Sequence, residues 1–154
     1  MTSSVESALN GLGLTLPEAI APVANYVPYV RTSNLLFVSG QISKTAAGAA
    51  VTGKLGVDVD VAGGQKAAEL CALNILAQVK AAMGDLDRIA RVVRLNAFVN
   101  SAPEFTDQPQ VVNGASNLFA NVLGEKGKHS RTAVGVAALP LGVAVEIDAI
   151  IAVS

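Results

Sequence analysis

The side chains best suited to chemistry lie near the end of the sequence, where charges interrupt apolar segments. Arg131 begins the apolar run 131–140, and Glu146 and Asp148 lie inside the run 143–153. Both runs have the composition of β-strands, in which alternate residues share a face. If the two strands are neighbours and these faces coincide, Arg131 comes close to a carboxylate in a cleft walled by small residues. An arginine in such a place is a planar, bidentate binder of a substrate carboxylate.

The same arrangement is also typical of a structural ion pair, in which Arg131 only balances Glu146. Spacing alone does not separate the two interpretations. His129, the only histidine, lies two residues before Arg131. It could be a catalytic base, but the polar residues around it, from Gly127 to Ser130, favour an exposed loop histidine.

The elements that position these residues can be predicted from periodicity and capping. Residues 26–32 and 35–42 favour a β-hairpin, and residues 91–99 favour a strand buried on both faces. Apolar residues recur at helical spacing over residues 60–83, with Gly84 as the stop.

A second helix is expected after a capping box at residues 101–104, with Pro109 in its first turn and Gly124 at its end. Ser3 and Glu6 predict another capping box, which opens a short N-terminal helix. The last two strands follow the second long helix. The order strand, strand, helix, strand, helix, strand, strand allows both long helices to cover one face of a single sheet.

The composition predicts one domain over residues 1–154, with residues 1–20 as an N-terminal extension packed on it. Hydrophobic residues make up 51% of the chain and charged residues 15%, whereas an average protein has about 25% charged residues. The strands carry apolar residues on both faces, so other copies of the chain are expected to cover part of the surface.

Several classes of function and location are disfavoured. No stretch reaches the roughly 20 apolar residues of a membrane span, and the N-terminus lacks the features of a signal peptide, so a cytoplasmic protein is expected. The net charge is −1 and no cluster of Lys and Arg stands out, which argues against nucleic acid as a partner. With Cys71 as the only cysteine and His129 as the only histidine, no metal site is predicted.

Parts of the sequence resemble the reactive intermediate deaminase family, also called RidA or YjgF-like. RTAVGVAALP at residues 131–140 and VEIDA at residues 145–149 are similar to the closing signature of the family, and NLLFVSGQI at residues 34–42 is similar to its early strand. The resemblance implies an α+β, chorismate-mutase-like fold, with a mixed sheet and two helices packed on one face. It also implies a homotrimer whose sheets form a central barrel, with clefts between subunits.

The resemblance implies a set of site residues as well. Arg131 matches the arginine that holds the substrate carboxylate, and Glu146 matches the glutamate that orients or activates the attacking water. Further substrate-binding positions implied by the match are Tyr26, Ser39, Ala133 and Asn113, with Tyr29 as the alternative tyrosine. The other interpretation of Asn113 is an exposed polar helix face that it shares with Asn117 and Asn121.

The chain departs from the family pattern at three positions. Asn25 stands where a proline usually precedes the tyrosine, Ala133 where cysteine is common, and Leu141 where a polar residue commonly follows the proline. Ala133 excludes a cysteine nucleophile at that position. Together these departures indicate a divergent branch of the family.

The activity implied by the resemblance is hydrolysis of enamines and imines of small 2-keto acids, with release of ammonia. Such electrophiles need a positioned water, a carboxylate anchor and a polar group to manage protons, so no cofactor is expected. The expected partners are this small carboxylate-bearing substrate and other copies of the chain. A non-catalytic trimer that binds small carboxylates or has a regulatory role is the alternative, and an endoribonuclease is a weaker one.

Overall fold

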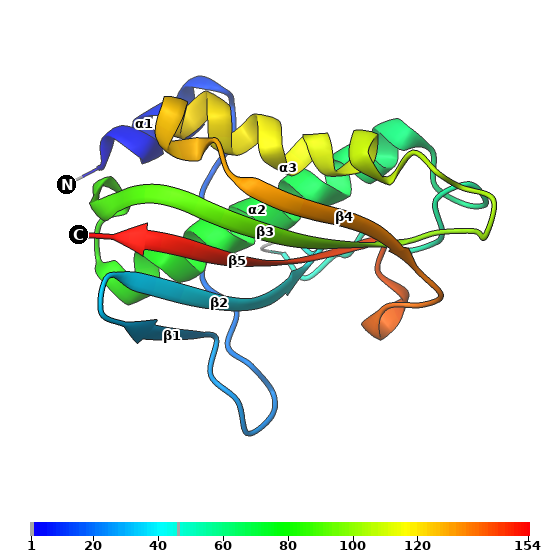
Figure 1. Ribbon diagram of the computed structural model, residues 1–154, viewed down its shortest axis with the longest axis horizontal. Coiled ribbons are helices and arrows are strands. Elements are labelled where there is room, and N and C mark those ends of the chain that lie inside the picture. The colour runs from blue at the N-terminus through cyan, green and yellow to red at the C-terminus, as the bar shows by residue number, and fades with distance from the viewer. Residues whose placement is uncertain (1, 46) are drawn as a thin grey trace.

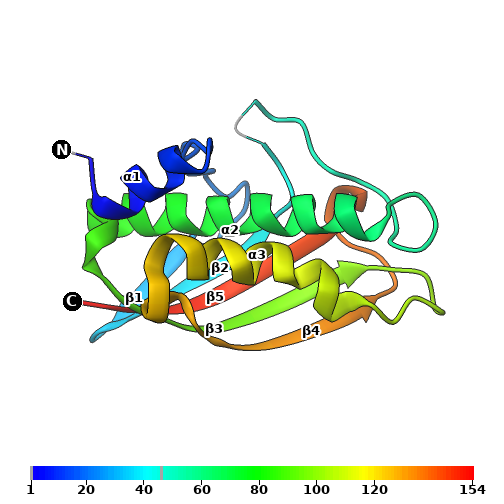
Figure 2. The same ribbon diagram turned by 90° about the horizontal axis from the view of Figure 1, so that it is seen from above.

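The computed structural model describes residues 2–45 and 47–154. Five strands form one mixed sheet in the order β1-β2-β5-β3-β4, and the helices lie on one of its faces (Figure 1 and Figure 2). The main elements are α1 (Ser4–Gly11), β1 (Tyr29–Thr32), β2 (Leu35–Ile42), α2 (Val61–Met83), β3 (Ile89–Asn100), α3 (Gln108–Leu123), β4 (Ser130–Val136) and β5 (Val145–Val153). Short 3-10 turns are η1 (Leu86–Arg88), η2 (Gly124–Gly127) and η3 (Pro140–Gly142). The predicted α+β fold and the order of its elements are confirmed.

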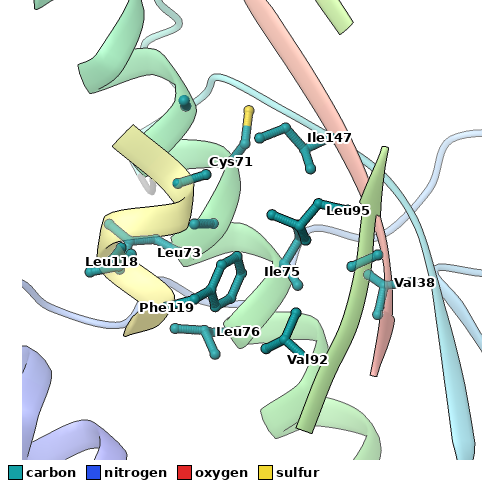
Figure 3. Packing of buried hydrophobic residues seen from close by; sticks show 14 of the residues in the cluster. Val38, Cys71, Leu73, Ile75, Leu76, Val92, Leu95, Leu118, Phe119 and Ile147 are labelled. Carbon is teal, nitrogen blue, oxygen red and sulfur yellow. The ribbon is translucent and has the colours of Figure 1, made fainter. Parts of the chain in front are cut away.

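The long helix α2 forms where periodicity and caps predict it. Asp60 is its N-cap and accepts a hydrogen bond from the Gly63 amide at 2.8 Å. Gly84 ends the helix in the left-handed conformation, with φ 77°, which glycine adopts without a Cβ clash. Residues 71–79 are buried throughout, because the helix packs against α3 and against strands β2 and β5 of the sheet. Figure 3 shows side chains of α2, α3 and the sheet meeting in one apolar core.

The start of α3 corrects one expectation. The helix begins at Gln108 after Asp107, which makes no side-chain capping bond, so the predicted capping box at residues 101–104 is wrong. The Ser101 hydroxyl instead donates to the Val99 carbonyl, at the end of β3. The prediction of Pro109 in the first turn is confirmed, and so is Gly124 as the C-cap.

The N-terminal helix α1 opens with the predicted capping box. The Ser3 hydroxyl accepts from the Glu6 amide at 3.1 Å, and the Glu6 carboxylate accepts from the Ser3 amide at 2.9 Å. Val5 and Leu9 are buried, and Asp87 in η1 accepts hydrogen bonds from Ser4. These contacts attach α1 to the rest of the domain. Within the described ranges, no helix combines the length and apolarity needed to cross a bilayer.

The described residues cover only one face of the sheet. β5 alternates between buried residues and partly exposed ones, and the partly exposed set includes Glu146 and Asp148. β3 shows the same contrast, so the expectation that it is buried on both faces is wrong for a single copy. The uncovered face carries apolar side chains, among them Phe37 and Val134, each 40% exposed.

Candidate functional site

Arg131 lies on β4, an edge strand of the sheet, on the side that faces the helices. Its register partner in β3 is Leu95, which is fully buried beneath the helices. The guanidinium reaches the outer side of α3. Its Nη1 donates to Asn113 Oδ1 and to Ser116 Oγ, each at 3.0 Å, and its Nη2 donates to the Pro109 carbonyl at 3.2 Å.

These bonds leave part of the guanidinium open. They use both Nη1 protons and one Nη2 proton, so Nε–H and the second Nη2–H have no partner among the described residues. No carboxylate of residues 2–45 or 47–154 forms an ion pair with Arg131. The structural ion pair considered for Arg131 and Glu146 is therefore not formed in the chain. Two donors on neighbouring nitrogens match the two oxygens of a ligand carboxylate.

Glu146 lies on the opposite face of the sheet from Arg131, which corrects the expectation of neighbouring strands with coinciding faces. β3 separates β4 from β5. Glu146 pairs with Phe98 of β3 and with Ile42 of β2. Two long-range features cause this. The last strand of the chain pairs between β2 and β3 and not with β4, and the register aligns Arg131 with Leu95 on the helix-covered face but Glu146 with Phe98 on the other face.

The Glu146 carboxylate is partly buried against the backbone of β2. A Cβ placed on Gly40 would lie 2.8 Å from Glu146 Oε1, so glycine leaves room for the carboxylate in its present position. Burial raises the pKa of Glu146 above its ordinary value of 4.5, and the negative charge of Asp148 raises the pKa further. A carboxylate with a raised pKa is better suited to exchange protons near neutral pH.

Ser39 and Tyr26 lie toward the β1 edge of the sheet. The Ser39 hydroxyl donates to the Val27 carbonyl at 2.8 Å and so holds the segment that leads into β1. Tyr26 is 55% exposed in that segment, whereas Tyr29 begins β1 and packs partly against the core. Of the two tyrosines, Tyr26 is therefore the one with its side chain available on the surface.

The sequence-predicted residues thus fall into two groups that one copy does not bring together. The arginine half-site contains Arg131, Asn113 and Ala133, which lie on β4 and α3. Ala133 follows Arg131 by two residues, on the same side of the strand, and packs partly against the core. The second group, the glutamate half-site, comprises Glu146 on the central strand β5, Ser39 on the neighbouring strand β2 and Tyr26 in the segment before β1. Figure 1 shows β1 and β4 at opposite edges of the sheet.

Asn113 lies within the arginine half-site and not on a purely exposed face. It is partly buried, and its side-chain oxygen accepts from Arg131. Ser116 makes an equivalent contact and was missed in the sequence. The signal that could have found it is spacing, because residues three apart lie on the same side of a helix.

His129 corrects another expectation, since it is not an exposed loop residue. Its ring is partly buried in edge contact with Phe119 of α3, with ring centroids 6.0 Å apart. Nε2 lies 2.9 Å from Ser116 Oγ, and Nδ1 lies 2.6 Å from the Gly127 carbonyl. Burial lowers the pKa of His129 below its ordinary value of 6.5. The Arg131 charge also lowers this pKa, against an opposing effect of the Gly127 carbonyl.

A comparison with protein families matches residues 6–149 to the family described as "YjgF/chorismate_mutase-like, putative endoribonuclease". The match covers the helices α2 and α3, strands β1 to β4, the first part of β5 and both half-sites. The sheet topology and the resemblance seen in the sequence therefore agree with an independent comparison.

Individual proteins show the same relationship. The chain is 53% identical over 148 residues to Protein TCP17 of Trypanosoma cruzi, which covers 96% of this chain and 92% of that protein. A crystal structure of the protein Atu1372 with unknown function from Agrobacterium tumefaciens is 58% identical, with a TM-score of 0.93, and covers 98% of this chain and 93% of that one. The crystal structure of RidA from the Antarctic bacterium Psychrobacter sp. PAMC 21119 is 29% identical, with a TM-score of 0.61. The match covers 88% of this chain and 94% of that one.

Proposed function

We propose that this chain, which belongs to the YjgF/chorismate-mutase-like family, is a cofactor-independent deaminase of enamine and imine intermediates of small 2-keto acids. The observation that carries the proposal is the Arg131 guanidinium. Three bonds to α3 hold it in place, while two neighbouring donors stay open and no carboxylate of the described residues neutralises its charge. Such a group binds a small carboxylate in a fixed orientation.

The substrate site is proposed to form between copies, in a homotrimer. Arg131 and Glu146 are on opposite faces of one sheet, so a substrate on the arginine of one copy requires the glutamate of another. The uncovered apolar face, with Phe37 and Val134, supports an assembly in which the sheets pack against each other. Three copies of the 15.6 kDa chain have a mass of about 47 kDa.

The proposed reaction is the hydrolysis of a carbon–nitrogen double bond. Water attacks the imine carbon, Glu146 accepts one proton from that water and passes it to the nitrogen, and a carbinolamine results. The proton of the carbinolamine hydroxyl is then transferred to the nitrogen, the C–N bond breaks, and ammonia leaves as the carbonyl forms. The products are ammonia and a 2-keto acid. The raised pKa of Glu146 supports this role, because a carboxylate that holds its proton more tightly is a stronger base toward water. Arg131 holds the substrate carboxylate throughout, so it aligns the carbon with the water.

A non-catalytic protein that binds small carboxylates is the alternative that the geometry also supports, since the arginine half-site is complete within one copy. An endoribonuclease receives less support. The basic side chains along β3 are engaged within the chain: Arg91 donates to the Lys128 carbonyl, and Arg94 donates to Thr132 and Asn96. They do not form an open basic groove of the kind that binds a phosphate backbone.

The proposal is tested by ammonia release from imines generated in situ, with wild type, Arg131→Ala and Arg131→Lys. Loss of a bidentate charge partner in a desolvated site costs roughly 2 to 5 kcal/mol, so Arg131→Ala should lower kcat/KM at least about 30-fold. Arg131→Lys should restore little, because an ammonium lacks the planar fork. Intact deamination and intact 2-keto acid binding in Arg131→Ala would overturn the proposed function. Binding without turnover in the wild type would favour the non-catalytic alternative.

A further inference from the structure

His129, Ser116 and Arg131 form a hydrogen-bond chain with a defined direction. The Gly127 carbonyl can only accept, so the proton of the neutral ring lies on Nδ1, which is 2.6 Å away. Nε2 is then an acceptor, and the Ser116 hydroxyl donates to it at 2.9 Å. The Ser116 oxygen is left as an acceptor for Arg131 Nη1 at 3.0 Å. Each group therefore donates toward Gly127, and the guanidinium begins the chain.

The Gly127 end of this hydrogen-bond chain is fixed by close packing. A Cβ on Gly127 would lie 2.1 Å from the Phe119 carbonyl oxygen, so the backbone of η2 touches the backbone of α3 directly. The Phe119 ring lies against His129 at an interplanar angle of 78°. The acceptor for Nδ1 and the plane of the ring are thus both set by contacts with α3. A side chain other than glycine at position 127 would separate these backbones.

We propose that His129 is a positioning residue for the substrate anchor: by accepting the Ser116 hydroxyl proton, it fixes the Ser116 oxygen toward Arg131 and so holds the guanidinium with its two open donors facing the ligand. The proposal rests on the proposed function of Arg131 as the carboxylate anchor. His129 itself does not touch the substrate. Without an acceptor at Nε2, the Ser116 hydroxyl is free to rotate, and Arg131 loses a defined partner on one side.

The charges around His129 fit a neutral ring. Arg131 approaches it from β4 through Ser116. Arg91 of β3 donates to the carbonyl of Lys128, the residue before His129. The Lys128 ammonium is paired with Glu125. A second proton on the ring would add a positive charge beside two arginines and would remove the acceptor that Ser116 uses.

The experiment compares two substitutions of His129 that differ in one property. His129→Gln places an amide oxygen where Nε2 can accept from Ser116, whereas His129→Leu fills similar space with no acceptor. Nuclear magnetic resonance of the ligand-free protein follows the side-chain N–H signals of Arg131. These signals are assigned as the ones that disappear from the spectrum of Arg131→Lys. Wild type and His129→Gln should show slowly exchanging Arg131 signals. In His129→Leu these Arg131 signals should exchange rapidly. In the wild type, the ¹⁵N chemical shifts of the His129 ring should show a proton on Nδ1 alone.

Binding and turnover provide the second readout. Loss of one ordered partner of a charged anchor should raise the Kd for pyruvate and the KM for its imine about tenfold in His129→Leu. kcat should change by less than about threefold, because the anchor binds substrate and transition state alike. His129→Gln should restore most of the affinity. Asn117→Ala, a neighbouring exposed residue of α3, is the matched control and should match the wild type in every readout.

The outcomes separate this inference from the proposed function. If His129→Leu keeps slowly exchanging Arg131 signals, or if His129→Gln and His129→Leu behave alike, His129 does not position the anchor. Absence of pyruvate binding and ammonia release in the wild type overturns the proposed function, while the Arg131 signals still decide the role of His129. If His129→Leu fails to fold, Ser116→Ala breaks the next link, because it removes the oxygen that accepts from Arg131 Nη1. Slowly exchanging Arg131 signals in Ser116→Ala would then overturn the inference.

Discussion

Arg131 and Glu146 lie on opposite faces of one sheet, with strand β3 between their strands. Arg131 points to α3, whereas Glu146 rests on the backbone of Gly40 in β2. In the proposed site, the glutamate that a substrate on Arg131 meets therefore comes from another copy of the chain. The two halves of the proposed site can therefore be perturbed independently.

Glu146→Gln should reduce activity and increase stability at neutral pH. The substitution removes the base but keeps the size of the side chain, so kcat should fall at least about 100-fold, while the Kd for pyruvate changes little. The ionised carboxylate is disfavoured by burial and by Asp148. Because the group is only partly buried, the gain in stability should stay below about 1 kcal/mol, or roughly 2 to 4 °C in Tm.

The pH dependence of this gain follows from the raised pKa of Glu146. Between 4.5 and the higher folded-state pKa, the folded protein binds more protons than the unfolded chain, so wild-type stability falls as pH rises through this window. The Tm difference between Glu146→Gln and wild type should be largest at neutral pH and should shrink below pH 4.5. Thermal melts that give the same difference at pH 4 and pH 7 would contradict this account.

Gly40→Ala tests whether the close contact with Gly40 holds the Glu146 carboxylate in its catalytic position. A Cβ at position 40 would lie 2.8 Å from Glu146 Oε1, so the mobile end of the carboxylate must move while the backbone can stay. We expect kcat to fall at least about tenfold, since small displacements of a catalytic group are costly, and Tm to remain within about 4 °C of wild type. Gly11→Ala is the control, because a Cβ there meets open space and φ is not positive. Equal activity in the two variants would contradict the contact.

His129 should make the protein less stable in acid. Burial and the Arg131 charge lower its pKa below 6.5 in the folded state, so the unfolded chain takes up a proton first as pH falls. The stability contribution is complete above pH 6.5 and is lost as pH falls through the folded-state pKa. Between pH 7 and pH 5, the Tm of the wild type should fall more than the Tm of His129→Gln. If the Tm values of the two proteins change with pH in the same way over this range, the pKa of His129 is not lowered in the folded state.

Local sequence signals predicted most of the elements. Asp60 and Gly84 cap α2 as expected, and the Ser3–Glu6 capping box opens α1. These features depend on backbone groups a few residues away, so they can be read from the chain directly. The predicted capping box at residues 101–104 failed because the Ser101 hydroxyl bonds back to Val99 and leaves no cap for α3.

The site was less predictable because it depends on long-range pairing. The insertion of β5 between β2 and β3 places Glu146 away from Arg131, and no local pattern encodes that order. The burial of His129 likewise depends on the contact between Gly127 and the backbone of α3. Asn113 was identified only through the family resemblance, and Ser116, which shares its contact with Arg131, was missed.

The shared site is the central claim, and co-expression of two inactive variants tests it. Arg131→Ala retains an intact glutamate half-site, and Glu146→Gln retains an intact arginine half-site. In mixed assemblies of the proposed trimer, an interface that joins the arginine of a Glu146→Gln copy to the glutamate of an Arg131→Ala copy is complete. With equal amounts and random assembly, about a quarter of the interfaces should be of this kind.

The decisive measurement is ammonia release by the purified mixed trimers, compared with each variant alone and with a co-expressed mixture of wild type and the double variant. Each single variant should have at most about 3% of wild-type activity, and the mixed trimers should recover about a quarter of it. Recovery to this level would show that Arg131 and Glu146 act from different copies. Activity of the mixed trimers no higher than that of the single variants, in assemblies that contain both chains, would contradict the shared site.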